Sequence, residues 1–125
     1  PLTVANLGSQ PDSYLLLADQ DGTLGSASDL PTGWTVRFFA SSTADCSVLG
    51  SEMGRIANVP AGGSVAYCAV VQAPKGQASQ PIWFAVRSAS NGSTDAVKDL
   101  VNVGNVRQLV LTRNMAPRAT VVWPP

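Results

Sequence analysis

Short runs of β-branched and aromatic residues, each bounded by Gly, Pro, Asn or Asp, recur along the whole chain, whereas helical periodicity is nearly absent. In the clearest runs, large apolar residues occupy every second position, which is typical of strands with one buried face. The pattern predicts an all-β fold: an antiparallel β-sandwich of about seven to nine strands with Greek-key connections. The residues expected to face inward on the clearest runs are Trp34, Val36, Phe38, Val65, Tyr67, Ala69, Val71, Ile82, Phe84 and Val86.

Turn signals separate these runs. Residues 60–63 (PAGG) predict a tight turn, and Asn91 with Gly92 offers the residues that tolerate positive φ at a hairpin tip. Residues 46–54 carry only a weak strand signal, and residues 55–59 predict an edge strand or an irregular connection. Residues 95–103 are expected to return from the hairpin as a strand. The residues expected on one face of that strand are Val97, Val101 and Val103.

Length and composition favour a single domain over residues 1–125. A chain of 125 residues with 45% hydrophobic content can bury one core. Eight basic and eight acidic residues give a formal charge of zero, so nucleic acid is not an expected partner. No apolar run approaches the roughly 20 residues of a membrane span, so membrane insertion is not expected either. The first residues lack the layout of a signal peptide, and we expect any targeting segment to lie outside this sequence.

Cys46 and Cys68 are the two cysteines of the chain, and it contains no histidine. A zinc site or a Cys–His nucleophile cannot be assembled from one copy, which leaves a disulfide or two free thiols. Cys46 follows a turn-like stretch and Cys68 lies in a strand-like run, so we predict a disulfide that clips a strand to a neighbouring loop or edge. Such a bond contributes roughly 3 kcal/mol and indicates an extracellular or cell-envelope location.

Other candidate site residues are weighed against simpler interpretations. Asp19 and Asp21 alternate as calcium ligands do, but the tight Asp-Gly turn is the preferred interpretation, and we expect no metal or cofactor. Trp83 lies opposite the inward-facing residues of its run, which makes it the candidate exposed aromatic for stacking on a sugar ring or packing under a neighbouring domain. Glu52 is the only Glu and no activated nucleophile is visible, so we do not expect an enzyme.

Several strand and turn segments occur in a characteristic order along the chain. They are VANLG at 4–8, DSY at 12–14, LPTGWTV at 30–36, VPAGGS at 59–64, SASNGSTD at 88–95 and DLV at 99–101. In this order they resemble the immunoglobulin-like conserved repeat domain of bacterial cell-surface proteins, a family of unknown function related to the sandwich domains beside carbohydrate-active enzymes. The resemblance implies an immunoglobulin-like antiparallel β-sandwich that serves as a stalk or spacer, with no catalytic residues to transfer.

The two ends of the chain suggest how such units associate. Residues 117–123 look like the opening strand that, in such repeats, runs into a segment like residues 2–6. Residues 116–125, with Val121, Val122 and Trp123, are therefore either a strand shared with a neighbouring domain or subunit, or a strand that folds back on its own domain.

These observations predict a non-catalytic structural repeat or assembly module that acts as a stalk, spacer or fibre subunit. Its expected partners are neighbouring copies of itself or adjacent repeats. The alternative is an adhesion module that binds a glycan or a surface protein, with Trp83 as the candidate contact.

Overall fold

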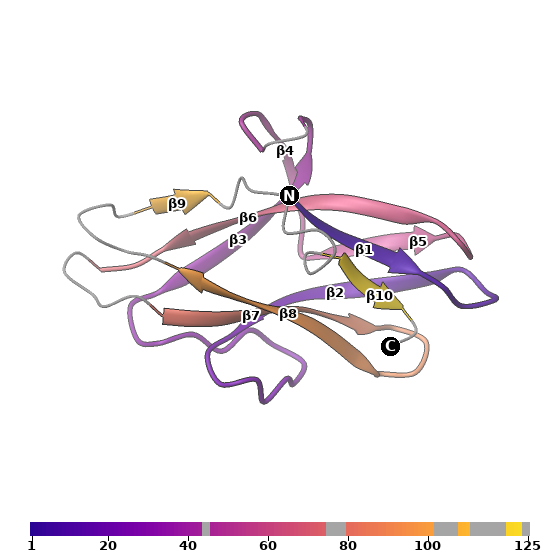
Figure 1. Cartoon of the computed structure of the whole chain (residues 1–125), viewed down its shortest axis with the longest axis horizontal. Helices are drawn as coiled ribbons and strands as arrows, with labels where there is room; N and C mark the ends of the chain where they lie inside the picture. Colours follow the sequence, from indigo (N-terminus) through magenta and orange to yellow (C-terminus); the bar gives the residue numbers. More distant parts are fainter. Residues whose placement is uncertain (44–45, 75–79, 102–107, 111–119, 124–125) are drawn as a thin grey trace.

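The computed structural model describes residues 1–43, 46–74 and 80–101, together with the strands at 108–110 and 120–123. The described strands form two sheets (Figure 1). One sheet has six strands, in the order β10-β1-β6-β3-β4 with β9 also paired to β6, and the other has the order β5-β2-β7-β8. The strands are β1 (Leu2–Asn6), β2 (Asp12–Asp19), β3 (Thr35–Ser41), β4 (Leu49–Glu52), β5 (Arg55–Val59), β6 (Ser64–Gln72), β7 (Gln80–Ser88), β8 (Thr94–Val101), β9 (Gln108–Val110) and β10 (Thr120–Trp123).

One core lies between the two sheets, as the alternation predicts. The six-stranded sheet contributes side chains from β1, β3 and β6, and the four-stranded sheet contributes side chains from β2, β5, β7 and β8. The buried core residues are Leu2, Val4, Tyr14, Leu16, Ala18, Trp34, Phe38, Ile56, Val59, Tyr67, Ala69, Val71, Ile82, Phe84, Val86 and Val101. Of the residues expected to face inward, Val36 and Val65 are only partly buried but pack against this core. The all-β fold with two facing sheets is therefore confirmed.

Both predicted turns occur. Gly62 has a φ of 77° in the turn before β6, and the N–H of Gly63 donates to the carbonyl oxygen of Pro60 at 2.9 Å. Gly92 has a φ of 73° at the tip of the hairpin between β7 and β8. Because a side chain disfavours positive φ, glycine at these two positions lets the chain turn from β5 in one sheet to β6 in the other, and from β7 to its partner β8.

The structure gives the bounds of the strands whose sequence signal was weak or ambiguous. The region of weak strand signal at residues 46–54 contains β4, which is held by its pairing with β3. The sequence of β4 by itself did not predict a strand. Residues 55–59 form β5, an edge strand as predicted. The strand after the hairpin ends at Val101, and Val103 lies outside the described residues. Val97 and Val101 face the core as predicted, and Asp99 between them is also buried.

Among the described strands the pairing is antiparallel, as predicted, except between β1 and β10, which run parallel. The parallel pair lies at an edge of the six-stranded sheet, where β1 is bonded to β6 on its other side. A strand that returns to pair with the first strand of the chain can run in either direction, so alternation within each strand could not reveal the choice.

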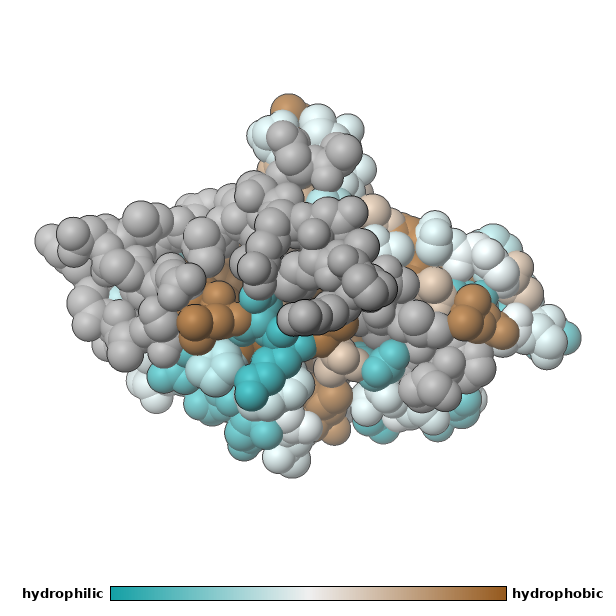
Figure 2. Space-filling model, in the orientation of Figure 1, coloured by the Kyte–Doolittle hydropathy of each residue, from teal (hydrophilic) through white to brown (hydrophobic). Residues whose placement is uncertain are grey.

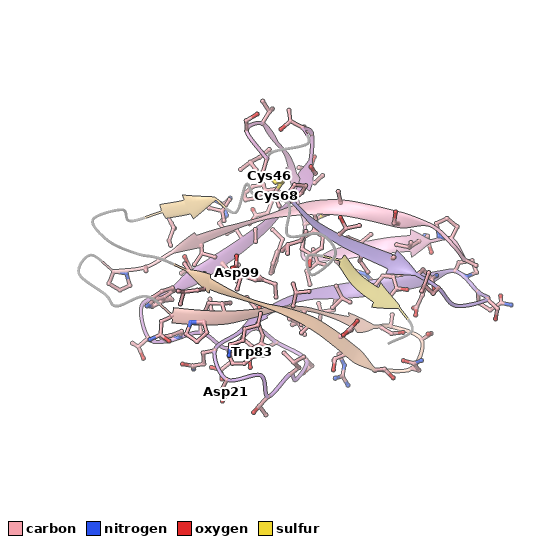
Figure 3. All side chains as sticks on the ribbon, viewed as in Figure 1. Asp21, Cys46, Cys68, Trp83 and Asp99 are labelled. Carbon is pink, nitrogen blue, oxygen red and sulfur yellow. A yellow bond between two sulfur atoms is a disulfide. The ribbon has the colours of Figure 1, made fainter. Side chains whose placement is uncertain are left out.

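The predicted disulfide joins Cys46 to Cys68, with a Cα–Cα distance of 6.0 Å. Cys68 lies on β6, and Cys46 lies in the segment between β3 and β4 (Figure 3). The bond therefore clips a loop to a strand of the six-stranded sheet, as the sequence suggests. Both half-cystines are buried.

Candidate functional site

Two of the predicted site residues, Asp19 and Trp83, lie on the outer face of the four-stranded sheet, with Asp21 in the adjoining loop. Strand pairing places side chains in rows across this face, because direct partners on neighbouring strands point to the same side. One row contains Asp19, Trp83 and Lys98, on β2, β7 and β8. A second row, four residues along β2, contains Arg55, Leu15 and Arg87, on β5, β2 and β7.

The loop between β2 and β3 covers the middle of this face. It is anchored beside β2, where the N–H of Gln20 donates to the carbonyl oxygen of Asp29 and the N–H of Asp29 donates to that of Ala18. Gly22 of this loop contacts Trp83 in the first row, and Ser26 lies beside Leu15 in the second row. Leu17 and Ala85, in the row between, are 2% and 0% exposed although they point away from the core. The loop therefore forms a cover on the outside of the sheet (Figure 1).

Three carboxylates meet where this loop leaves β2. Oxygen atoms of Asp19, Asp21 and Asp29 all lie within 4.8 Å of one another, so the structure adds Asp29 to the predicted pair. Three such oxygens are ligands that a hard cation such as Ca²⁺ accepts. The same residues also build the tight turn: the N–H of Thr23 donates to Asp21 Oδ1 at 2.9 Å, and Gly22 has a φ of 78°. The turn interpretation accounts for these contacts, and we propose no metal.

The acidic pair is electrostatically asymmetric. Burial raises the pKa of the Asp19 carboxyl above its ordinary value, and the adjoining Asp21 carboxyl raises it further. The hydrogen bond from the N–H of Thr23 lowers the pKa of Asp21, and the hydrogen bond from the Asp19 carboxyl lowers it further. Asp19 is consequently the member of the pair that holds a proton more tightly, because its oxygens are away from water while Asp21 is exposed.

Trp83 lies on the outer face, as alternation predicts, but its indole is not an open stacking surface. The Lys98 Nζ atom lies 4.6 Å from the ring centroid, in cation–π geometry. Gly22 packs so closely on the ring that a Cβ added to it would lie 3.3 Å from Trp83 Cε2. Figure 3 shows Trp83 and Asp21 on the same side of the sheet. The residue is partly buried, which corrects the expectation of an exposed aromatic.

A cavity of about 350 Å³ opens at the other end of the face. Leu15 and Ala89 give it apolar lining, and Arg55 and Arg87 place two guanidinium groups around it. The other lining residues are Ser26, Ser88 and Gly92. The two arginines are contributed by strands that both pair with β2 at Leu15.

The predicted terminal strand lies at a second location, the edge of the six-stranded sheet. Backbone pairing sets Val121 beside Val4, Val122 beside Ala5 and Trp123 beside Asn6. Asn6 is buried, and its backbone is also bonded to the turn before β6: its N–H donates to Gly63 and its carbonyl oxygen accepts from Gly62. β10 therefore lies beside a strand whose end is firmly held.

Large exposed hydrophobic side chains are scattered over the described surface. They are Leu7, which follows β1, Val48, which precedes β4, and Leu100 on β8. On the face drawn in Figure 2, the coloured hydrophobic residues form separate small areas among hydrophilic ones. Single exposed apolar residues of this kind are ordinary for a protein surface.

Sequence reasoning missed Asp29, Lys98, Arg55 and Arg87 as neighbours of the candidate residues. Lys98, Arg55 and Arg87 lie on different strands from the candidate residues beside them. Asp29 lies later in the same loop as Asp21, where no ligand-like spacing connects it to the predicted pair. A signal existed for Arg87 alone, since it alternates with Val86 on a strand already predicted to have one outward face.

In the described part of the chain there is no helix of the length and hydrophobicity needed to cross a membrane. Comparisons with protein-family models, with curated proteins and with solved structures gave no match.

Proposed function

We propose that this chain is a non-catalytic structural module of an exported protein, an immunoglobulin-like Greek-key unit that joins to like units through its first and last strands. The observation that carries the proposal is the parallel pairing of β1 with β10 at the edge of the six-stranded sheet. Support for a location outside the cytosol comes from the Cys46–Cys68 disulfide, because such bonds persist mainly in oxidising compartments.

The direction of β10 suits a serial arrangement of units. Thr3 is paired with Thr120 and Asn6 with Trp123, so both strands run toward the same end of the sheet. The chain therefore enters β1 at one end and leaves β10 near the other. A unit that followed would be placed beyond the second end, as in an extended stalk.

Strand exchange between copies would use the same contacts. An edge strand is held mainly by backbone hydrogen bonds, which a second copy of the same segment can make in the same register. The pairing within one chain thus specifies the register that an exchanged strand would adopt. In this arrangement β10 of one unit covers the β1 edge of its neighbour.

Cysteine cross-linking tests the exchange directly. Thr3 and Thr120 are Cα partners, a separation that a disulfide can bridge. Chains carrying Thr3→Cys and chains carrying Thr120→Cys are mixed, refolded together with the native disulfide intact, and oxidised. We expect a covalent heterodimer on non-reducing gels. A mixture of Thr3→Cys with Ser9→Cys, a residue on an exposed turn, is the matched control and gives no such product.

A single chain with both Thr3→Cys and Thr120→Cys serves as the reference for pairing within a molecule. If this chain closes on itself while the mixture yields no heterodimer, β10 is not exchanged and the assembly proposal is wrong. Sedimentation of the full chain and of a chain ending at Thr112 gives an independent measurement. Concentration-dependent association that survives the truncation would also contradict the proposal.

A further inference from the structure

The cavity on the outer face of the four-stranded sheet brings together two arginines that the proposed assembly does not use. Arg55 and Arg87 are both paired with Leu15, so they lie on opposite sides of it in one row. Neighbouring strands are about 5 Å apart, which puts the two Cα atoms about 10 Å apart on the same face. Two arginine side chains at that separation can reach a common ligand above Leu15.

No other described residue engages either guanidinium group. Within the residues that the structure describes, neither has an ion-pair or hydrogen-bond partner, whereas Arg37 on the other sheet is bonded to both carboxylate oxygens of Glu52. The cavity has no acidic lining residue among those described. The carboxylate of Asp12 is hydrogen-bonded to Ser88, which lines the cavity. It already accepts hydrogen bonds from the hydroxyls of Ser88 and Ser90.

The hairpin tip holds one of these groups in place. A Cβ added to Gly92 would lie 3.1 Å from Arg87 Nη2, so the guanidinium packs against the glycine backbone. Gly92 has a φ of 73°, a conformation that favours glycine. The Arg87 guanidinium group therefore lies beside the hairpin tip, which itself lines the cavity.

The volume and the lining of the cavity indicate the chemistry of the uncharged part of the ligand. A cavity of about 350 Å³ is within the range that holds small organic ligands and is larger than a bare oxyanion fills. Its lining combines the apolar side chains of Leu15 and Ala89 with Ser26 at the loop that covers the face. Such a lining suits a small ligand that presents both an apolar C–H face and hydroxyl groups.

We infer that this cavity binds an acidic saccharide unit, with Arg55 and Arg87 donating hydrogen bonds to its carboxylate or sulfate and Leu15 lying under its ring. Guanidinium groups match the geometry of both oxyanions and form charge-assisted hydrogen bonds to them. The cavity lies on the sheet opposite β1 and β10, so the inference does not depend on strand exchange.

NMR titration of the full chain with sodium D-glucuronate tests the inference. We expect saturable shifts of the amide signals of Leu15, Ser26 and Gly92, with an affinity at least about ten-fold higher than for D-glucose or sodium acetate. Equal binding of glucose would show that the arginines are not used. Equal binding of acetate would show that the sugar ring is not recognised, and either result would overturn the inference.

Substitution of the arginines tests their role. Arg55→Gln and Arg87→Gln should each weaken glucuronate binding by about ten-fold, because each removes a charged donor. Arg37→Gln is the matched control, since it removes an arginine from the other sheet, and it should leave the affinity within about two-fold. Thermal unfolding of each variant verifies folding. Unchanged affinity in both folded Arg55 and Arg87 variants would overturn the inference whether or not the cross-linking experiment succeeds.

Discussion

Asn6 on β1 donates a hydrogen bond of 3.0 Å from its Nδ2 atom to the carbonyl oxygen of Val59 on β5, which belongs to the other sheet. The same nitrogen donates to the carbonyl oxygen of Gln10 at 2.9 Å, and the Oδ1 atom accepts from the N–H of Gly8 at 2.9 Å. One buried amide therefore joins the two layers at the end where β1 finishes. The amide donates two hydrogen bonds and accepts one, which uses most of its hydrogen-bonding capacity.

Replacement of this amide should be costly. We expect Asn6→Ala to lower the free energy of unfolding by about 2–3 kcal/mol, because the buried carbonyl oxygen of Val59 loses a donor that water cannot easily replace. Guanidinium unfolding followed by circular dichroism measures the loss. Asn91→Ala is the control: Asn91 is exposed and accepts one bond, from Ser93, so its loss should cost less than about 1 kcal/mol. Equal losses would contradict the bridging role of Asn6.

The disulfide should contribute substantially to stability. Cys46 and Cys68 are 22 residues apart, and closing a loop of that length lowers the entropy of the unfolded chain enough to stabilise the fold by about 3 kcal/mol. The double variant Cys46→Ala/Cys68→Ala should lose about that amount in guanidinium unfolding. A thiol assay on native protein should find no reactive sulfhydryl at these positions, and two titratable thiols per chain would contradict the bond.

The ionisation of Asp12 makes the free energy of unfolding depend on pH. Burial raises the pKa of its carboxyl, but hydrogen bonds from Ser88, Ser90 and the N–H of Ser13 outweigh this and bring the pKa below the ordinary value of 3.8. The folded state therefore favours the ionised form. Its stabilising contribution is complete above the ordinary pKa and is lost as the pH falls through the lowered one.

Unfolding measured between pH 5 and pH 2 should show this loss, and Asp12→Asn should fall less steeply below about pH 4. The Asp12 carboxyl carbon, followed by NMR, should titrate at higher pH in Ser88→Ala, since that variant removes a hydroxyl donor to the carboxylate. An Asp12 titration that is identical in the two proteins would show that the hydroxyl does not set the pKa.

Two glycines of the covering loop make a matched pair. Gly22 has a φ of 78° and faces the Trp83 ring, where a Cβ would lie 3.3 Å from Cε2, whereas Gly25 has open space around it. Gly22→Ala should therefore lower stability by about 1–2 kcal/mol, the cost of a left-handed conformation for an L-residue. Gly25→Ala should lower it by less than about 0.5 kcal/mol. Thermal unfolding of both variants measures the difference, and equal midpoints would contradict the packing of the loop on Trp83.

Alternation along single strands was sufficient to predict which residues of the clearest runs face the core. Tyr67, Ala69 and Val71 on β6 face the core because successive side chains of a strand point to opposite sides, whatever strands lie next to it. The turn at Gly92 was equally local, since it needs only residues that tolerate positive φ. The disulfide was predicted from two steps: the lack of histidine left a disulfide or two free thiols, and the turn-like and strand-like surroundings of Cys46 and Cys68 favoured the bond.

Contacts across strands were decided only by the tertiary structure. Arg55 and Arg87 flank Leu15 because of the register of β5 and β7 on β2, and that register is set by the packing of the whole core. The loop over Trp83 and the parallel direction of β10 beside β1 likewise depend on where distant segments meet. A sequence specifies the period of each strand locally, but pairing joins residues far apart in the chain, so the candidate cavity exists only once the sheets have assembled.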